Sequence, residues 1–210
     1  MTFAREGHFY IALAAALSLL AIASGTWWIA VPMLVLTALV INFFRDPERV
    51  VPVGEQLVTA PADGKVVAIV EHLVEERFLG KPCTRVSIFM SPLNVHVNRI
   101  PVDGTVVAVE HTAGRFHAAF LDKASEYNER NAVVVEDPRG ERVLFVQIAG
   151  QLARRIVCHV TSGDHVRRGE RYGMIIFGSR LDLYLPEMVK LAVAIGDRVT
   201  AGETIIGSYP

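Results

Sequence analysis

The dipeptide Gly178-Ser179 separates two apolar runs in the stretch MIIFGSRLDLYLP, which extends from Met174 to Pro186. Glycine leaves its carbonyl carbon unshielded, and the hydroxyl of the following serine can attack that carbon. The attack would move the acyl group from nitrogen to oxygen. β-Elimination from the ester would then leave dehydroalanine, which hydrolyses to a pyruvoyl group with loss of ammonia. A β-bulge or tight corner is the alternative interpretation of a glycine at this place.

Two further side chains suit proton transfer. His96 lies in SPLNVHVNRIP, and an imidazole titrates near neutral pH, although a lone histidine on a strand equally fits a structural role. Asp63 lies in PADGK, where Asp-Gly is also ordinary turn chemistry. The other histidines form no HxH or HExxH set, and Cys83 and Cys158 have no zinc-ligand spacing, so we expect no metal.

The N-terminal region from Phe9 to Phe44 contains no Asp, Glu, Lys or Arg. One continuous helix of that length would measure about 54 Å, which exceeds a hydrocarbon core of about 30 Å. Residues 24–26 (Ser-Gly-Thr) offer a break, so the pattern predicts a hairpin of two apolar helices, 9–23 and 27–44. A signal peptide, a buried soluble hairpin, and a single span with an interfacial helix are the alternatives.

Basic residues flank the outer ends of this region, with Arg5 before it and Arg45 and Arg49 after it. This placement predicts a membrane anchor, residues 1–49, whose two ends lie on the cytoplasmic side, with the catalytic domain, residues 50–210, also on that side. The formal net charge of −1 gives no support for a nucleic-acid partner.

Residues 50–210 are expected to be mainly β, with a minor helical element at Arg115–Arg130. The expected strands are short segments rich in Val and Ile that are bounded by Gly, Pro or Asp. They comprise residues 65–74, 84–90, 105–112, 131–137, 142–150, 154–160 and 191–195.

Two motifs occur twice. PADGKVVAIVE at Pro61–Glu71 is similar to PVDGTVVAVE at Pro101–Glu110, and the pattern GDxVxxGE begins at Gly163 and again at Gly196. Such hairpin pairs resemble the barrel-sandwich hybrid of lipoyl and biotinyl carrier domains. We find no exposed lysine at a hairpin tip of the kind that those carriers modify.

Taken together, the blocks resemble the phosphatidylserine decarboxylase family, in its short, archaeal-type branch. The resemblance covers nearly the whole chain. It depends on the order of six blocks, FFRDPER, APADGKV, FMSPLNVHVNRIPVDG, KASEYNERN, GQLARRIVC and FGSRLDLYLP.

The resemblance implies self-cleavage between Gly178 and Ser179, giving a β chain, 1–178, and an α chain, 179–210, that remain together. The α chain would begin with the pyruvoyl group made from Ser179, the covalent cofactor. Its ketone would form a Schiff base with phosphatidylserine in the membrane, and loss of CO₂ would give phosphatidylethanolamine.

The family's functional residues match this chain only in part. Longer members use an Asp and a His with the Ser during self-cleavage, and Asp63 and Ser179 match two of these. The HxxH motif of those members is reduced here, because His96 matches the first histidine and Arg99 replaces the second. We expect His96 to act as a proton donor or base in decarboxylation. The block at Asn128–Asn131 receives no individual roles.

Two other functions compete with this one. A pyruvoyl decarboxylase that acts on a soluble amino acid would leave the apolar anchor unexplained. A membrane-anchored, non-enzymatic adaptor with a lipoyl-like domain would explain the anchor and the repeats, but not the ordered blocks.

Overall fold

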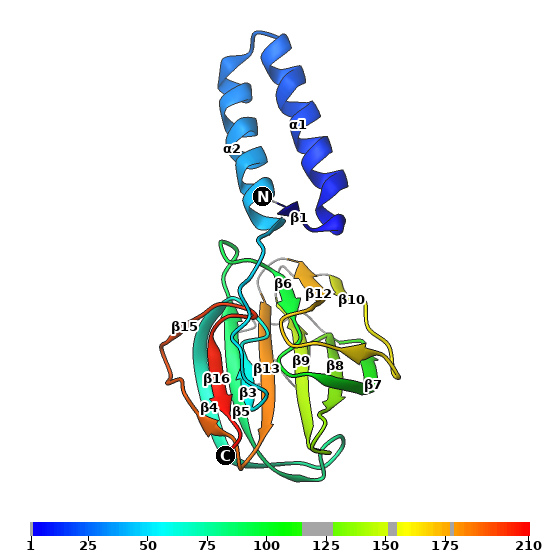
Figure 1. The fold of residues 1–210 in the computed structure, drawn as a ribbon. Helices are drawn as coiled ribbons and strands as arrows, with labels where there is room; N and C mark the ends of the chain where they lie inside the picture. The colour runs from blue at the N-terminus through cyan, green and yellow to red at the C-terminus, as the bar shows by residue number, and fades with distance from the viewer. Residues whose placement is uncertain (1, 115–127, 151–154, 177–178) are drawn as a thin grey trace. The chain divides into compact units, whose positions relative to one another are not determined.

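A computed structural model of the chain describes residues 2–114, 128–150, 155–176 and 179–210. The chain forms two compact units, Met1–Glu48 and Arg49–Pro210. In the first unit, helices α1 (His8–Ala23) and α2 (Trp27–Phe43) pack as a hairpin (Figure 1), which confirms the two predicted helices and the break between them. The first unit also contains a short 3₁₀ helix, Arg5–Gly7, and the paired strands β1 (Thr2–Phe3) and β2 (Arg45–Asp46).

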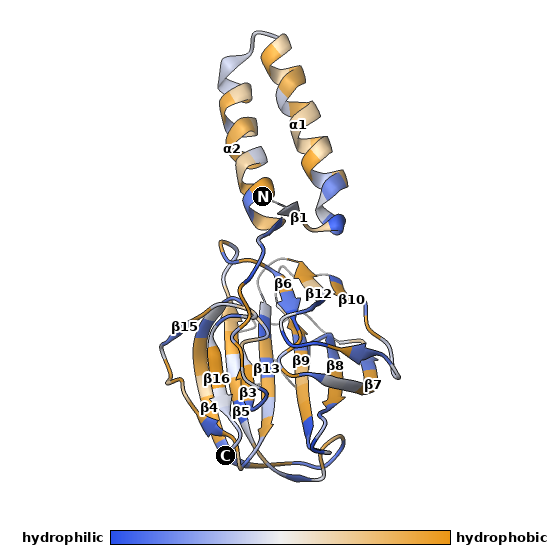
Figure 2. Cartoon of the chain, in the orientation of Figure 1, coloured by the Kyte–Doolittle hydropathy of each residue, from blue (hydrophilic) through white to orange (hydrophobic). Residues whose placement is uncertain are grey.

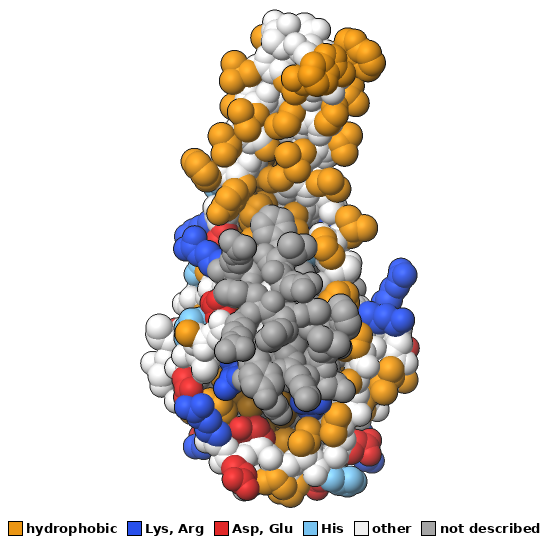
Figure 3. Space-filling model, turned by 180° about the vertical axis from the view of Figure 1, so that it is seen from behind, with side chains coloured by type: hydrophobic (Ala, Val, Ile, Leu, Met, Phe, Trp, Pro, Cys, Tyr) orange, Lys and Arg blue, Asp and Glu red, His pale blue; other side chains and the backbone are white. Residues whose placement is uncertain are grey.

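The two helices are held together by small residues and one polar contact. The hydroxyls of Ser18 and Thr37 are 2.9 Å apart across the pair. Most of the large apolar side chains point outward instead, and apolar residues surround both helices (Figures 2 and 3). The segment Arg5–Ala23 is long and apolar enough to cross a membrane, and Trp27–Phe43 is shorter. A helix that is apolar on all sides is typical of a buried or membrane environment.

The second unit consists of β-strands that are all paired antiparallel. Its main sheet has eight strands that curl around the core (Figure 1). In spatial order these are β11 (His165–Val166), β7 (Gly104–Thr112), β8 (Arg130–Glu136), β9 (Arg142–Ala149), β13 (Ser179–Pro186), β5 (Lys81–Met90), β4 (Gly64–Glu75) and β15 (Arg198–Val199).

Two three-stranded sheets complete the unit. The first has the order β10 (Arg155–Cys158), β12 (Arg171–Ile176), β6 (Val97–Arg99). The second has the order β14 (Lys190–Leu191), β16 (Ile205–Ser208), β3 (Leu57–Thr59). The prediction of a mainly β domain is confirmed.

Most of the expected strands are confirmed, but the segment 191–195 was predicted wrongly. Only Leu191 belongs to a strand, because Ala194 and Asp197 form a turn in which the Ala194 N–H donates to the Asp197 carboxylate at 2.8 Å. The expected helix at 115–130 falls mostly outside the described residues, and its last residue, Arg130, begins β8.

The sequence repeats occupy equivalent places in the fold. The strand pair β15–β4 matches Arg198 with Lys65 and Val199 with Gly64, while the pair β11–β7 matches His165 with Thr105 and Val166 with Gly104. The glycines are required in both copies. A Cβ at Gly64 would lie 2.2 Å from the Phe89 carbonyl oxygen, and a Cβ at Gly104 would lie 2.2 Å from that of Glu136.

The main sheet separates two apolar clusters. Leu181, Leu183 and Leu185 of β13 join the larger core, together with the side chains of β4, β5 and β9 that face inward. A smaller cluster on the other face contains Ile148 and Tyr184. Because side chains alternate along a strand, Ser179 shares the core face with Leu181, and Arg180 lies on the opposite face.

Candidate active site

Ser179 is the first residue of β13, where the chain passes from one sheet to another. β12 ends at Ile176 in a three-stranded sheet, and β13 begins in the eight-stranded sheet between β5 and β9. Ser179 pairs with Met90 on one side and Ala149 on the other. Gly178 lies outside the described residues.

The Ser179 side chain is fully buried, and its Oγ has no hydrogen-bond partner within the described residues. Buried hydroxyls normally form a hydrogen bond, because leaving one unpaired costs free energy. An unpaired hydroxyl next to the predicted cleavage site is therefore better suited to nucleophilic attack than to holding a corner.

His96 lies next to the strand that leads to Ser179. Its carbonyl accepts a hydrogen bond from the Ile175 N–H at 3.4 Å, one residue beyond the pairing of Val97 with Met174. The side chain is fully buried, and Nδ1 is 3.0 Å from the Asn94 carbonyl oxygen. Since a carbonyl can only accept, Nδ1 carries the proton, and Nε2 is the basic nitrogen of the neutral ring.

The turn before His96 fixes this orientation. The Asn94 Oδ1 accepts hydrogen bonds from the Ser91 N–H at 2.9 Å and from the Ser91 hydroxyl at 2.7 Å. The turn follows Met90, the pairing partner of Ser179, so the histidine and the serine are held at the same end of β5.

Asp63 directly precedes β4, at the same end of the main sheet as Ser179. Its carboxylate accepts two hydrogen bonds from Arg49 Nη2, at 2.8 and 3.1 Å, and one from the Ala201 N–H at 2.8 Å. Strand β5 lies between β4 and β13, so the backbones of Asp63 and Ser179 are about 10 Å apart at the usual strand spacing. The structure therefore holds Asp63 in an ion pair with Arg49.

Arg99, at the position where the resemblance led us to look for a second histidine, is buried near Asp63. Its Nη1 donates to the Gly169 carbonyl at 2.8 Å. A Cβ at Gly202 would lie 3.0 Å from the Arg99 Cδ and 3.8 Å from the Arg49 Cβ. The two arginines thus flank the same tight turn, and Gly202 has the positive φ of 75° that favours glycine.

Asn128 supports the strand on the other side of Ser179. Its Nδ2 donates to the Ala149 carbonyl at 2.7 Å, and Ala149 is the residue that pairs with Ser179. The next residue in the block, Glu129, accepts the Ala149 N–H at 2.9 Å through its backbone carbonyl. The block 128–131, to which the sequence assigned no individual roles, therefore holds the backbone beside Ser179.

Sequence reasoning missed a buried chain of amides. Asn131 Nδ2 donates to Gln147 Oε1 at 3.1 Å, and Gln147 Nε2 donates to Asn98 Oδ1 at 2.9 Å. All three side chains are buried, and Asn98 Nδ2 lies 3.7 Å from the Met90 sulfur. Asparagine and glutamine within otherwise apolar strand segments were the sequence signal that could have predicted these buried amides.

A buried ion pair was also missed. Arg180 Nε is 2.9 Å from Asp182 Oδ1, and Arg180 Nη2 donates to Asp182 Oδ2 at 2.9 Å. Both side chains are almost completely buried on the face of β13 opposite Ser179. The alternation SRLDLY contained this signal, because Arg180 and Asp182 are two residues apart on one strand.

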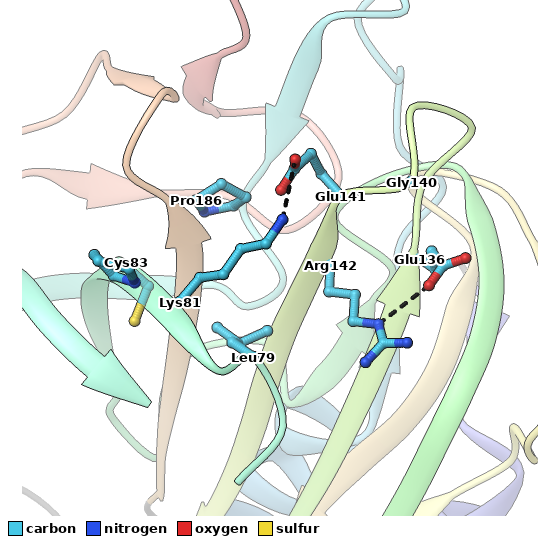
Figure 4. Close-up of a pocket in the computed structure, with 9 residues that line it drawn as sticks. Leu79, Lys81, Cys83, Glu136, Gly140, Glu141, Arg142 and Pro186 are labelled. Carbon is cyan, nitrogen blue, oxygen red and sulfur yellow. Dashed lines mark hydrogen bonds and ion pairs between the residues drawn. The ribbon is translucent and has the colours of Figure 1, made fainter. Parts of the chain in front are cut away.

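A cavity of about 210 Å³ lies at the other end of β13 (Figure 4). Lys81 and Glu141 form an ion pair of 3.5 Å at its rim. Its residue Pro186 pairs with Cys83, about 23 Å along the strand from Ser179 at the usual rise per residue. This cavity is therefore separate from the candidate site. Within the described ranges, no three His, Cys, Asp or Glu side chains gather as a metal site, and the absence of a metal stays a prediction.

Comparison with known proteins agrees with this geometry. The family model described as phosphatidylserine decarboxylase matches residues 36–207. A phosphatidylserine decarboxylase proenzyme of Syntrophus aciditrophicus is 51% identical over 87% of this chain and 85% of its own length. Proenzymes of the same name from Burkholderia mallei and Aromatoleum aromaticum are 46% and 48% identical, each over 99% of this chain and 95% of its own length.

The chain belongs to the phosphatidylserine decarboxylase family. The resemblance inferred from the sequence blocks is thereby confirmed at the level of the family. The relatives are named proenzymes, a name that agrees with a chain made as a precursor. Assignment to the short, archaeal-type branch of the phosphatidylserine decarboxylase family stays a prediction.

Proposed function

We propose that this chain is a phosphatidylserine decarboxylase that cleaves itself between Gly178 and Ser179. The observation that supports this most directly is the buried Ser179 Oγ, which has no hydrogen-bond partner in the described parts of the chain. Family membership supplies the reaction, and the position of Ser179 at the start of β13 supplies a nucleophile held between two strands.

Self-cleavage uses only groups of the chain and one water molecule. Ser179 Oγ attacks the Gly178 carbonyl carbon, and the bond from that carbon to the Ser179 nitrogen breaks. Removal of the Ser179 α-proton then expels the ester oxygen, so that Gly178 ends in a carboxylate. The resulting dehydroalanine takes up a proton at Cβ to become an imine, and water hydrolyses this imine to ammonia and the pyruvoyl group. When present, the pyruvoyl group would supply a ketone that can condense with the substrate amine, and a conjugated electron sink for the pair that departing CO₂ leaves behind.

Each surrounding residue has a proposed task. His96 Nε2 accepts or donates the proton that moves during decarboxylation, since Nδ1 is committed to the Asn94 carbonyl. The Asp63 carboxylate binds Arg49 and the Ala201 N–H at the same end of the sheet as Ser179, so we assign it a positioning role in self-cleavage. Asn128 holds Ala149, and with it the strand beside Ser179.

The anchor brings the domain to its substrate. We propose that the hairpin of α1 and α2 inserts into the cell membrane, with residues 50–210 on the cytoplasmic side, as the flanking Arg5, Arg45 and Arg49 favour. The β chain, 1–178, and the α chain, 179–210, stay together after cleavage because β13 pairs with both β5 and β9. We further propose that the repeated hairpins form a lipoyl-like barrel-sandwich hybrid.

Intact-mass spectrometry of the purified protein beside a Ser179→Ala variant tests this function. We expect two fragments divided after residue 178, with a ketone in place of the amine at the start of the smaller one, and a single chain for the variant. The cleaved protein should release CO₂ from phosphatidylserine in mixed micelles and leave free serine unchanged. A folded protein that remains one chain in both samples would overturn the proposal.

A further inference from the structure

Several basic side chains lie in a row across the outer face of the main sheet. The row crosses β13 at Arg180, the residue after Ser179. Residues that pair directly across antiparallel strands share a face of the sheet. The pairings run from β15 to β8 in the order Arg198, Lys65, Phe89, Arg180, Ile148 and Arg130. Arg180 in this row is neutralised by Asp182.

Lys65 and Arg198 are the exposed end of this row. They pair directly across β4 and β15, and both side chains are exposed to solvent. Within the described residues, neither side chain has an acidic partner. Like charges directly opposite each other on neighbouring strands destabilise a sheet, so this arrangement needs an explanation outside the fold.

The second copy of the repeat shows that the fold does not require these cations. The equivalent pair on β7 and β11 is Thr105 and His165, and the Thr105 hydroxyl lies 3.0 Å from His165 Nδ1. The same backbone pairing thus accepts a hydrogen-bonded polar pair in the copy far from Ser179. Opposed cations occur only in the copy beside Ser179.

The two cations line a cavity of about 450 Å³. Its other lining residues include Gly64, Phe89, Ser91 and Leu93. Leu93 is 64% exposed at the tip of the turn between β5 and β6, so an apolar edge adjoins the two charges. A cavity with cations inside and an apolar rim fits an anionic group that is attached to a hydrocarbon chain.

This cavity adjoins the candidate active site. Phe89 pairs with Lys65 on one side and with Arg180 on the other, and the next residue along β5, Met90, pairs with Ser179. Ser91 holds the turn that orients His96. One strand, β5, lies between Lys65 and Ser179, so their backbones are about 10 Å apart at the usual strand spacing. In the headgroup of phosphatidylserine two carbons and one oxygen separate the amine from the phosphorus, and lysine and arginine carry their charges on long, flexible side chains.

We propose that Lys65 and Arg198 bind the phosphodiester of the phosphatidylserine headgroup in this cavity. The proposal rests on the proposed function and adds a subsite to it. Arginine offers paired N–H donors to a phosphate, and lysine contributes a compact charge. An anion bound between the two cations would relieve their repulsion.

The test compares Lys65→Gln/Arg198→Gln with Arg167→Gln/Lys190→Gln. Both double variants lose two positive charges from exposed positions, so general attraction to an anionic surface changes equally. Intact mass first establishes that both self-cleave as the parent does. We then expect the first pair to raise KM for phosphatidylserine in mixed micelles by about tenfold or more, and the control to change it less than about twofold.

A binding measurement separates this proposal from the chemistry. Glycerophosphoserine is titrated in non-ionic micelles into three full-length proteins. These are Ser179→Ala alone, Ser179→Ala with the Lys65/Arg198 changes, and Ser179→Ala with the Arg167/Lys190 changes. We expect the Lys65/Arg198 variant to weaken binding by about tenfold or more. Equal binding in all three proteins would overturn the proposal, as would inorganic phosphate that binds as tightly as glycerophosphoserine. Absence of a pyruvoyl group would instead overturn the proposed function.

Discussion

Asp63 and Asp103 accept the same backbone hydrogen bond in the two halves of the repeat. Asp63 Oδ1 accepts the Ala201 N–H at 2.8 Å, and Asp103 Oδ1 accepts the Arg168 N–H at 2.8 Å. One task of Asp63 is therefore structural, because Asp103 performs it far from Ser179. Among the contacts of the described residues, Asp63 also binds an arginine, Arg49, through both carboxylate oxygens, and Asp103 does not.

Comparing Asp63→Asn with Asp103→Asn separates the structural task from any part in self-cleavage. Each change weakens a turn, and the Asp63 change also breaks a mostly buried ion pair, which we expect to cost about 2 kcal/mol more. If Asp63 positions the site, cleavage slows by about tenfold or more only in Asp63→Asn, as followed by the appearance of fragment 179–210 over time. Equal cleavage rates in the two variants would assign Asp63 to the turn alone.

Asn128→Asp should impair self-cleavage by removing one donor. The substituted carboxylate would face the Ala149 carbonyl without a proton to offer, at a buried site, so we expect a loss of about 2–3 kcal/mol in the free energy of unfolding. Asn94→Asp is the matched control, because Asn94 Oδ1 only accepts hydrogen bonds from Ser91. Full cleavage in Asn128→Asp would show that the Ala149 contact is dispensable.

Gln147→Leu breaks the buried amide chain at its centre. Asn131 loses an acceptor and Asn98 loses a donor, and we expect a cost of about 2–4 kcal/mol in urea unfolding. The double variant Asn98→Leu/Gln147→Leu should cost less than the sum of the single changes, because no partner of that pair remains unpaired. Additive costs would mean that the two amides act independently.

Tyr172→Phe should leave stability unchanged or raise it by about 1 kcal/mol at pH 7, because the buried Tyr172 hydroxyl has no hydrogen-bond partner among the described residues. Burial raises the pKa of Tyr172 well above its ordinary value of 10.0. Above pH 10 the phenol of the unfolded chain loses its proton, while the buried phenol of the folded chain keeps it. The free energy of unfolding therefore falls as the pH rises.

The variant should therefore gain most in alkaline solution, as circular dichroism during urea unfolding at pH 7 and above pH 10 would show. Tyr184→Phe is the contrasting control, since Tyr184 has a polar partner in Arg85 and should lose stability at pH 7. A Tyr172→Phe protein that is clearly less stable at both pH values would contradict the expectation.

The apolar hairpin and most of the strands followed from the sequence, because their signals are local. An uncharged run broken at 24–26 gives two helices, and short Val-rich segments between Gly, Pro and Asp give strands. The exception, 191–195, was an apolar segment in which a turn at Asp197 prevailed over strand propensity.

The sequence by itself determined the family, the two-part organisation and the identity of Ser179 as the candidate nucleophile, since all three depend on residue type and order along the chain. Tertiary structure decided which residues surround that serine. Asn128, Gln147 and Lys65 are far apart in sequence, and only strand pairing sets them around Ser179. The register of antiparallel strands brings residues together that are distant in sequence. A local pattern of apolar residues does not specify which strands pair.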